Sequence, residues 1–402
     1  MLLMLVLRSL VGSTYRGATA STGIEGVDFR TTYMAAARLK AGEPLYLDEK
    51  EAKSGGNLIC QFTCSPLIPM LFQPFVKQPW EQSMKIWAGI NVTVLAVATF
   101  LFCWGSRVRI LDNPAPALLV MFSAFRYWPT VIEVALGNTH LLLLGLVCGM
   151  IVCNRYQSWL AMAILVAIGA LVKTWMIGMI FPFLVMRRWR EAAVAVILFV
   201  IGLGVLCLFN GGTQTLAGFF AVTHAYSSEP GLISHSVSGL ARQYFTENLL
   251  IAPLVKSQWA WFAAMLIGYG IIITGLAILF IRGRELDEKQ RQLSIALSAL
   301  ALILGSPVSH IMYFPLALPT IWTLLCRPWP GRHSLAAPIA AFSMYLLLTI
   351  PWPCVTPVPE SYRTGPRSLL LAMIFLPSAS IWIYGVLLAR TRDDENLSRV
   401  SD

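Results

Sequence analysis

The chain has 402 residues, of which 57% are apolar and 12% are charged, and its net charge is +10. Ordinary globular domains carry about 25% charged residues, and several apolar windows here exceed eighteen residues, so the composition excludes a soluble globular enzyme and predicts a polytopic membrane protein. Most basic residues cluster at the ends of apolar runs, as in cytoplasmic loops, so no nucleic-acid partner is expected.

Apolar runs predict twelve membrane spans. The first is either a short transmembrane helix or a cleaved signal peptide, and we favour the helix because the later topology needs it. Several runs are shorter than the ~20 residues of a straight span, so broken helices are expected, and the total falls to ten or eleven if 115–136 or 157–186 is re-entrant. The predicted spans are 1–20, 84–105, 115–136, 138–154, 157–172, 174–186, 191–210, 258–281, 292–306, 309–326, 334–352 and 368–389.

Charge predicts the orientation. With both termini cytoplasmic, the inner loops hold fifteen Lys and Arg residues, against four in the outer loops beyond the first. This asymmetry fits the positive-inside rule. We therefore expect an all-α membrane protein of about 10–12 transmembrane helices that forms one membrane-embedded domain over 1–402. Its large outer loops are 21–83 and 211–257, its cytoplasmic tail is 391–402, and its function lies on the outer face of the cell membrane.

The first outer loop holds the strongest candidate for chemistry. Phe29–Ala41 has the spacing of an interfacial amphipathic helix, and Gly42-Glu43-Pro44 ends it. The Pro-rich stretch 66–79 is too short to span and predicts helices lying against the bundle. Asp28 is expected to face a wet cavity, either as a general base or as the N-cap of the helix that follows.

Four further polar residues are candidates for function, two of them in or between apolar runs and two on the outer side. Glu133 is an acid within a predicted span and lies two helical turns after Arg126, so the two are expected on one face about 10 Å apart. Lys173, between two apolar runs, either binds a phosphate or snorkels to the interface. His310 and Arg242 lie on the outer side, where each could contact a phosphate. The alternatives are a structural role for His310 and simple solvation at the surface for Arg242.

The cysteines leave one disulfide open and form no metal-binding motif. Cys60 and Cys64 stand four residues apart in the first outer loop, either as a disulfide or as two neutral thiols. No Cys-x-x-Cys pair or HExxH motif is present, and neither a metal nor another cofactor is expected.

Six stretches, in order, resemble the motifs of glycosyltransferase family 87 in the GT-C superclass, whose members are polyprenol-phosphate-mannose-dependent membrane mannosyltransferases. Asn138 and His140 stand where that family usually has Gln and Asn, and His235 replaces a Gln. The stretches are the segment from Asp28 through Tyr33 to Tyr46, FTCSPLIPMLFQPF at 62–75, GNTHLL at 137–142, Lys173 with Arg187-Arg188-Trp189-Arg190, SHSVSGLAR ending at Arg242, and Ser306-Pro307-Val308-Ser309-His310.

The resemblance implies a reaction. A hexose, mannose in that family, moves from a polyprenyl-phosphate sugar in the bilayer to a hydroxyl of a glycolipid or glycan acceptor, with inversion at the anomeric carbon. It implies Asp28 as the catalytic base and Lys173, Arg242 and His310 as ligands of the donor phosphate. Because side-chain cations aim at the leaving phosphate, a metal is not obligatory. Further candidates for substrate contacts are Tyr33, Asn138, His140 and His235, which lie in the matching stretches, and Glu133 and Arg126, which are charged residues within a predicted span.

Two other functions fit a polytopic chain of this kind. A transporter or flippase of lipid-linked sugars predicts internal repeats and broken helices that meet at the bilayer midplane. No clear repeat is present, and the polar candidates gather at one face. An inactive subunit of an envelope-assembly complex is the third hypothesis, and replacing Asp28 by Asn separates the enzyme from both.

Overall fold

The structure, a computed structural model, describes residues 26–46, 64–108, 114–228, 234–247, 253–283 and 286–326, together with 336, 338–343, 345 and 378–388. Within these residues the protein is all-helical, as predicted. Its helices are α2 Val27–Lys40, α4 Leu67–Phe72, η2 Gln73–Lys77, α5 Trp80–Gly105, α6 Pro114–Arg126, α7 Trp128–Leu136, α8 His140–Arg155, α9 Trp159–Val172, η3 Thr174–Ile180, α10 Phe181–Val185, α11 Trp189–Phe209, α12 Thr213–Ser228, α13 Val237–Phe245, α14 Gln258–Arg282, α15 Glu288–Gly305, η5 Ile311–Ala317 and α16 Leu318–Cys326.

Three of these helices, α5, α11 and α14, are long and apolar enough to cross a membrane. At 26 residues α5 is about 39 Å long, more than the hydrocarbon core of a bilayer. Every predicted span between 84 and 326 contains helix, although several of these helices are shorter than a bilayer. The predicted span 1–20 lies outside the described residues, as does most of 334–352, and in the span 368–389 a helix covers Ser378–Leu388.

The predicted span 115–136 is not one straight helix. Tyr127 has an extended backbone (φ −68°, ψ 119°) between α6 and α7, and the two helices meet at a bend of 48°. Pro129, in the first turn of α7, has no N–H to continue the ladder of hydrogen bonds, so the sequence itself breaks the helix. Counted as one broken span, this pair gives up to four candidate spans among the described residues.

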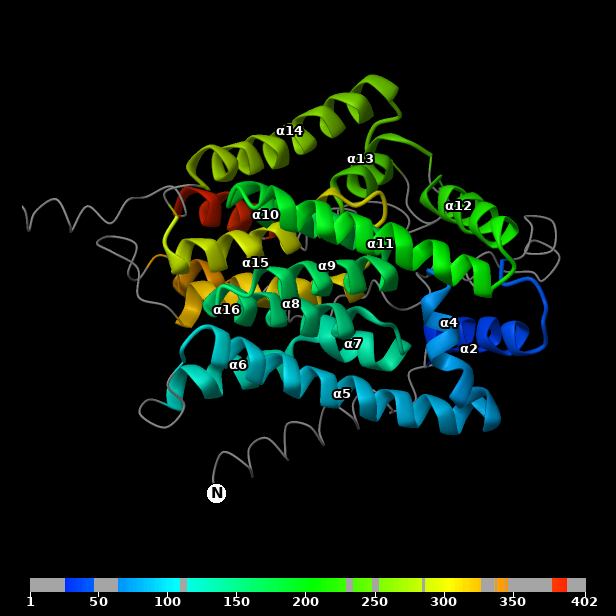
Figure 1. Ribbon diagram of the computed structural model, residues 1–402. Helices are drawn as coiled ribbons and strands as arrows, with labels where there is room; N and C mark the ends of the chain where they lie inside the picture. The colour runs from blue at the N-terminus through cyan, green and yellow to red at the C-terminus, as the bar shows by residue number, and fades with distance from the viewer. Residues whose placement is uncertain are drawn as a thin grey trace, which may run out of the picture.

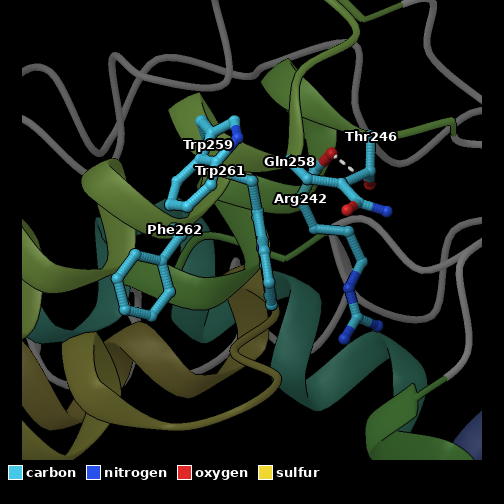
Figure 2. A pocket seen from close by; sticks show the side chains of 6 residues that line it. All are labelled: Arg242, Thr246, Gln258, Trp259, Trp261 and Phe262. Atoms are coloured by element: carbon cyan, nitrogen blue, oxygen red, sulfur yellow. Dashed lines mark hydrogen bonds between the residues drawn. The ribbon is translucent and has the colours of Figure 1, made fainter.

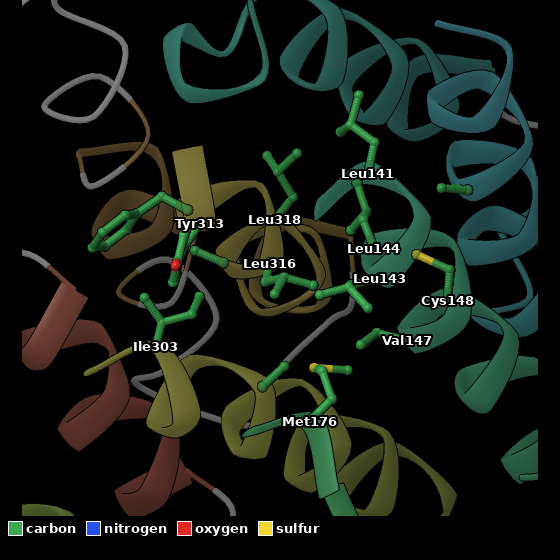
Figure 3. Packing of buried hydrophobic residues seen from close by; sticks show 14 of the residues in the cluster. Leu141, Leu143, Leu144, Val147, Cys148, Met176, Ile303, Tyr313, Leu316 and Leu318 are labelled. Atoms are coloured by element: carbon green, nitrogen blue, oxygen red, sulfur yellow. The ribbon is translucent and has the colours of Figure 1, made fainter. Parts of the chain in front are cut away.

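Helix α8 lies at the centre of the bundle, packed between α5 and α9. Several of its leucines and Val147 are fully buried, and Figure 3 shows Leu143 of α8 pointing toward Leu316 of η5. Gly105 of α5 approaches the α8 backbone so closely that an added Cβ would lie 3.0 Å from the nitrogen of Val152. Close packing of small and aliphatic residues therefore fixes where α8 lies against α5.

The two ends of the bundle differ (Figure 1). One end, which we call the Asp28 end, gathers α2, α4 and α12 with the starts of α5, α8 and α14. The other, which we call the basic end, gathers the loops that carry Arg107, Arg155 and Arg187 and the start of α15. Consecutive long helices run between the ends, so the loops alternate from one end to the other.

Within the large loops the predicted helices are present. The amphipathic segment predicted at Phe29–Ala41 is α2, and the chain turns at Gly42, where φ is +73°. The Pro-rich stretch forms α4 and η2, which pack against α2. The second loop, for which no helix was predicted, contains α12 and α13, and Ser236 caps α13 by accepting a hydrogen bond from the Gly239 N–H.

Candidate active site

Helix α2 fixes the position of Asp28 at the Asp28 end. The helix begins at Val27, after Gly26 in the left-handed region (φ +66°), and the Gly26 N–H donates to the carbonyl of Ala135, 2.9 Å away. Phe29 is fully buried against Phe72, with 5.6 Å between the two ring centroids. The end of α7 and the α4 aromatic ring therefore anchor the first turn of α2.

Asp28 is not the N-cap of this helix, so that alternative is wrong. Gly26 occupies the cap position and Asp28 is the second helical residue. Its carboxylate instead accepts a hydrogen bond from Asn138, with 2.8 Å between Asn138 Nδ2 and Asp28 Oδ2. The sequence allowed either role, and the start of the helix one residue before Asp28 excludes capping.

The surroundings of Asp28 favour a stronger base than an exposed aspartate. Burial raises the pKa of the Asp28 carboxyl, and the hydrogen bond from Asn138 opposes that rise. The Glu133 carboxylate raises the pKa further, while Lys173 and His140 lower it. Since burial is the largest of these effects, the carboxylate holds a proton more readily than a free side chain does.

The turn between α7 and α8 brings Asn138 to Asp28. Gly137 closes α7 in the left-handed region (φ +73°), and a Cβ added there would lie 2.6 Å from the Cβ of Phe29. The Gly137 carbonyl accepts a hydrogen bond of 2.9 Å from the indole N–H of Trp87. Only glycine fits this close approach, so the contact between α2 and the turn explains the residue.

Glu133 pairs with His140, and the predicted arrangement of Glu133 beside Arg126 is wrong. Both Glu133 and His140 are fully buried, with 3.1 Å between Glu133 Oε2 and His140 Nδ1. Arg126 ends α6 and is exposed to solvent. The prediction assumed one continuous helix, and the break at Tyr127 removes the common face.

Lys173 lies between α9 and η3, and its Nζ donates a hydrogen bond to Cys64 Sγ at 3.0 Å. Lys173 and Asp28 interact electrostatically. Cys64 is a buried free thiol, and Cys60, the other cysteine of the first outer loop, lies outside the described residues. A cavity of about 310 Å³ opens at this contact, and its lining is Cys64, Ser65, Lys173, Thr174, Trp175, Phe219, Thr223, Ser306, Pro307, Val308 and Tyr313.

Tyr313 links this cavity to the two candidate histidines. Its ring centroid lies 4.1 Å from that of His140 and 5.9 Å from that of His310, and it stacks on Trp175 at 5.8 Å. His310 is partly buried at the start of η5. The ring contacts therefore place His310 beside the Lys173 cavity.

The stretches 234–239 and 306–310, far apart in the sequence, are joined by hydrogen bonds. The Ser309 N–H donates to Ser234 Oγ (2.8 Å), and the His235 N–H donates to the Ser309 carbonyl (2.6 Å). Ser238 Oγ donates to the Pro307 carbonyl at 2.9 Å. His235 is buried with its ring edge-on to Phe314, so its observed contacts hold the loop before His310.

Arg242 lines a different cavity from Lys173. Figure 2 shows its side chain extending beside Trp261, with Gln258 and Thr246 near its stem. This cavity has a volume of about 560 Å³ and is also lined by the aromatic rings of Trp259 and Phe262. The structure thus brings Lys173, His310, Asn138 and Asp28 to one neighbourhood but places Arg242 at a second, aromatic one.

Other contacts were only partly foreseeable. The Tyr33 hydroxyl donates to the carbonyl of Gln78 at 2.7 Å, so Tyr33 ties α2 to η2. Sequence reasoning missed the roles of Cys64 as the partner of Lys173 and of Met312, whose Sδ accepts from Asn138 at 3.3 Å. No periodicity or motif signals such pairs. The described part of the chain contains no group of three or more His, Cys, Asp and Glu residues that suits a metal ion.

Comparison with known proteins gives one family. Residues 62–307, more than half of the chain, match the family model described as glycosyltransferase family 87. The matched stretch contains the Glu133–His140 region, Lys173 and Arg242, while Asp28 and His310 lie outside it. No curated protein matches the chain.

Proposed function

The chain belongs to glycosyltransferase family 87 and is a membrane glycosyltransferase, and from this premise we propose its reaction. The protein transfers a hexose, mannose in our proposal, from a polyprenyl-phosphate sugar to a hydroxyl of a lipid or glycan acceptor. The transfer inverts the anomeric carbon. Asp28 is the general base, and Lys173 and His310 bind the donor phosphate.

The observation that carries this proposal is the placement of a carboxylate and a cation in one neighbourhood. Asn138 donates to Asp28 at 2.8 Å and to Met312 Sδ at 3.3 Å, and the next residue, Tyr313, lines the 310 Å³ cavity together with Lys173. An inverting transfer needs both groups, because a base must take the acceptor proton on one side while a cation stabilises the leaving group on the other.

In the proposed step, the acceptor oxygen forms a bond to the anomeric carbon as its proton passes to Asp28. The bond between that carbon and the phosphate oxygen breaks, and its electron pair leaves with polyprenyl phosphate. Lys173 stabilises the growing negative charge, and His310 donates a hydrogen bond to the same phosphate. Exchange with solvent then returns Asp28 to its ionised form.

Arg242 is assigned separately, because it lines the second cavity rather than the one at Lys173. A guanidinium next to several aromatic rings suits an anionic or sugar-bearing part of a substrate near the membrane surface. The family resemblance implied that Arg242 binds the donor phosphate. We do not keep that assignment, and whether Lys173 and Arg242 bind the same phosphate is tested by combining their substitutions.

We propose that the Asp28 end faces the extracytoplasmic side of the cell membrane. The arginines of the short loops gather at the opposite end, which suits the cytoplasmic side by the positive-inside rule. Both termini are then cytoplasmic, and residues 1–402 act as one membrane-embedded unit. Accessibility of single introduced cysteines at Glu43 and at Arg190 to a membrane-impermeant thiol reagent tests this orientation.

The decisive experiment measures sugar transfer by the purified protein from polyprenyl-phosphate mannose to a membrane glycolipid extract. Asp28→Asn is expected to lower kcat by about 100- to 10,000-fold, the usual contribution of a general base. Glu43→Gln, at an exposed carboxylate just beyond the same helix, is the matched control and is expected to retain the rate.

Full transfer by the Asp28→Asn protein would reject Asp28 as the base. Absence of transfer by the wild-type protein with every polyprenyl-phosphate hexose would reject the proposed donor class. Nuclear magnetic resonance of the anomeric proton in the product tests inversion, since retention would require a covalent intermediate that the proposed step does not form.

A further inference from the structure

Glu133 has no part in the proposed chemistry, yet it is a fully buried acid next to the site. Its Oε1 accepts a hydrogen bond of 2.5 Å from the backbone N–H of His140, and its Oε2 lies 3.1 Å from His140 Nδ1. Both carboxylate oxygens therefore contact one residue, the first of α8.

The backbone of Glu133 holds the same turn from its other side. Its carbonyl accepts hydrogen bonds from the N–H groups of Gly137 (3.0 Å) and Asn138 (3.4 Å). Thr139, at the N-cap position of α8, makes no side-chain cap bond, so the Glu133 carboxylate supplies from α7 a partner that the first turn of α8 otherwise lacks. Glu133 thus contacts the turn at residues 137, 138 and 140.

This turn carries the amide that holds Asp28. Asn138 Nδ2 donates to Asp28 Oδ2, and Asn138 Oδ1 accepts from the N–H of Thr139 at 2.8 Å. The second bond fixes the side chain against its own turn, so a shift of the turn moves the amide with it. Without Glu133, the buried N–H of His140 loses its partner, which favours a rearrangement of the turn.

We propose that Glu133 is a positioning residue, which holds the turn 137–140 so that Asn138 orients the Asp28 carboxylate toward the acceptor. The inference rests on the proposed function, because it takes Asp28 to be the base. Glu133 touches neither substrate nor the reacting atoms. Its side chain has no exposed surface, and its carboxylate is held by the backbone of His140 and Leu141 and by the His140 ring.

Glutamine can replace Glu133 in this role. Within the described residues His140 Nε2 has no hydrogen-bond partner, so the ring proton is assigned to Nδ1, where it donates to Glu133. In Glu133→Gln the amide oxygen can accept from the His140 backbone N–H. The amide NH₂ can donate to Nδ1 once the ring proton moves to Nε2. Leucine, of similar size, can make neither bond.

The test compares four variants in the mannose-transfer assay: Glu133→Gln, Glu133→Leu, Asn138→Ala and the double variant that combines Glu133→Leu with Asn138→Ala. Glu133→Leu is expected to lower kcat by about 10-fold or more, the effect of losing a hydrogen bond to a charged group, with little change in KM for the donor. Glu133→Gln is expected to recover most of that loss. The double variant is expected to match Asn138→Ala, because both changes remove the same contact.

The acid limb of the pH–rate profile provides a second readout. The charged or titratable groups that act on Asp28 are Glu133, Lys173 and His140, together with the Asn138 hydrogen bond, which lowers the Asp28 pKa. Asn138→Ala therefore moves the acid limb to higher pH. Glu133→Leu is expected to move it the same way, because losing the Asn138 hydrogen bond has a larger effect on the Asp28 pKa than losing the Glu133 charge, which acts in the opposite direction. Glu133→Gln keeps the turn and removes a negative charge near Asp28, so it is not expected to move the acid limb to higher pH.

Three results would overturn the inference. Equal losses in Glu133→Gln and Glu133→Leu would show that the charge or proton of Glu133 is needed, and multiplying losses in the double variant would show that Glu133 does not act through Asn138. If Glu133→Leu does not fold, Glu133→Asp replaces it, and full activity in Glu133→Asp with none in Glu133→Gln would reject positioning. Retained activity in Asp28→Asn would instead reject the proposed function, so the two failures are distinguishable.

Discussion

The basic end and the Asp28 end of the bundle each contain a pair of ionisable side chains, but the two pairs differ in their exposure to solvent. At the basic end, Arg107 and Glu288 pair at 2.7 Å with their side chains 61% and 30% exposed. At the Asp28 end, Glu133 and His140 pair at 3.1 Å with no exposed surface at all. The first pair is open to water and the second is enclosed by protein.

The difference indicates where function lies. An exposed ion pair contributes about 0–1 kcal/mol and is easily replaced, whereas a buried ionisable group carries a desolvation penalty of several kcal/mol that its partners only partly offset. A chain keeps such groups inside a membrane protein where they serve substrates or position other groups. Substitutions should therefore be tolerated at the basic end and costly at the Asp28 end.

The largest contrast is expected between two cations. Lys173→Met should lower kcat/KM for the donor on the order of 100-fold, because the leaving phosphate loses a charged donor. Arg107→Met at the basic end should leave transfer unchanged. Steady-state rates in detergent, with the donor varied, measure both. Equal losses in the two variants would remove the functional distinction between the ends.

A related prediction compares the two cations Lys173 and Arg242 with each other. Because Lys173 and Arg242 line different cavities, Lys173→Met and Arg242→Met should act independently. The fold-loss in kcat/KM of the double variant should then equal the product of the two single losses. A double variant no worse than Lys173→Met alone would mean that both cations bind one phosphate.

Gly137 and Gly42 allow a matched test of packing at the Asp28 end. Both have φ of +73°, but an added Cβ would collide with Phe29 and Met84 at Gly137 and would meet nothing at Gly42. Each Gly→Ala change forces an alanine into the left-handed region, at a cost of roughly 1–3 kcal/mol. Gly137→Ala should be the more destabilising and should also slow transfer, since it displaces the first turn of α2. Thermal unfolding and activity assays check both, and equal melting temperatures would exclude the steric contact.

The pH dependence of stability tests the burial of Asp28. Because burial raises the Asp28 pKa in the folded protein, the folded state holds this proton more tightly than the unfolded state. The wild type therefore loses stability relative to Asp28→Asn as pH rises through the unfolded and then the folded pKa. We expect Asp28→Asn to melt at a higher temperature at neutral pH, with the difference vanishing below about pH 4. A lower melting temperature for Asp28→Asn at every pH would contradict this burial.

The smallest effect is expected at the Arg107–Glu288 pair. Arg107→Met should change the free energy of unfolding by less than about 1 kcal/mol, and added salt should reduce even this difference. Denaturation at two salt concentrations measures it. A loss of several kcal/mol would show that the loops at the basic end carry more of the stability than their exposure suggests.

Much of the fold could be predicted because it depends on local pattern. Long apolar runs indicated α5 and α14 within a few residues, and the amphipathic spacing after Asp28 indicated α2. A break within 115–136 was allowed for, but its position at Tyr127 was not predicted, although Pro129 stood in the sequence, because the apolar run continues across it. Boundaries set by a single backbone angle leave no periodic signal.

The site was predictable as a set of residues but not as a set of contacts. Asp28, Asn138, Lys173 and His310 were identified from polarity in an apolar chain and from the family resemblance. Their partners depend on tertiary packing between segments as far apart as Cys64 and Lys173, which no spacing rule relates. The same packing moved Glu133 from an expected pair with Arg126 to His140.

Because Cys64 is hydrogen-bonded to Lys173, a spectroscopic label on this thiol would lie next to the proposed phosphate site. The Cys64 thiol is buried, like those of Cys103, Cys148 and Cys207, and it lines the cavity that we assign to the donor, whereas Cys153 and Cys326 are partly exposed, so the other cysteines would be replaced before labelling. A small fluorescent or spin-labelled reagent attached at Cys64 would sense the arrival of a phosphate at Lys173. Donor occupancy could then be followed in real time without any turnover of the sugar.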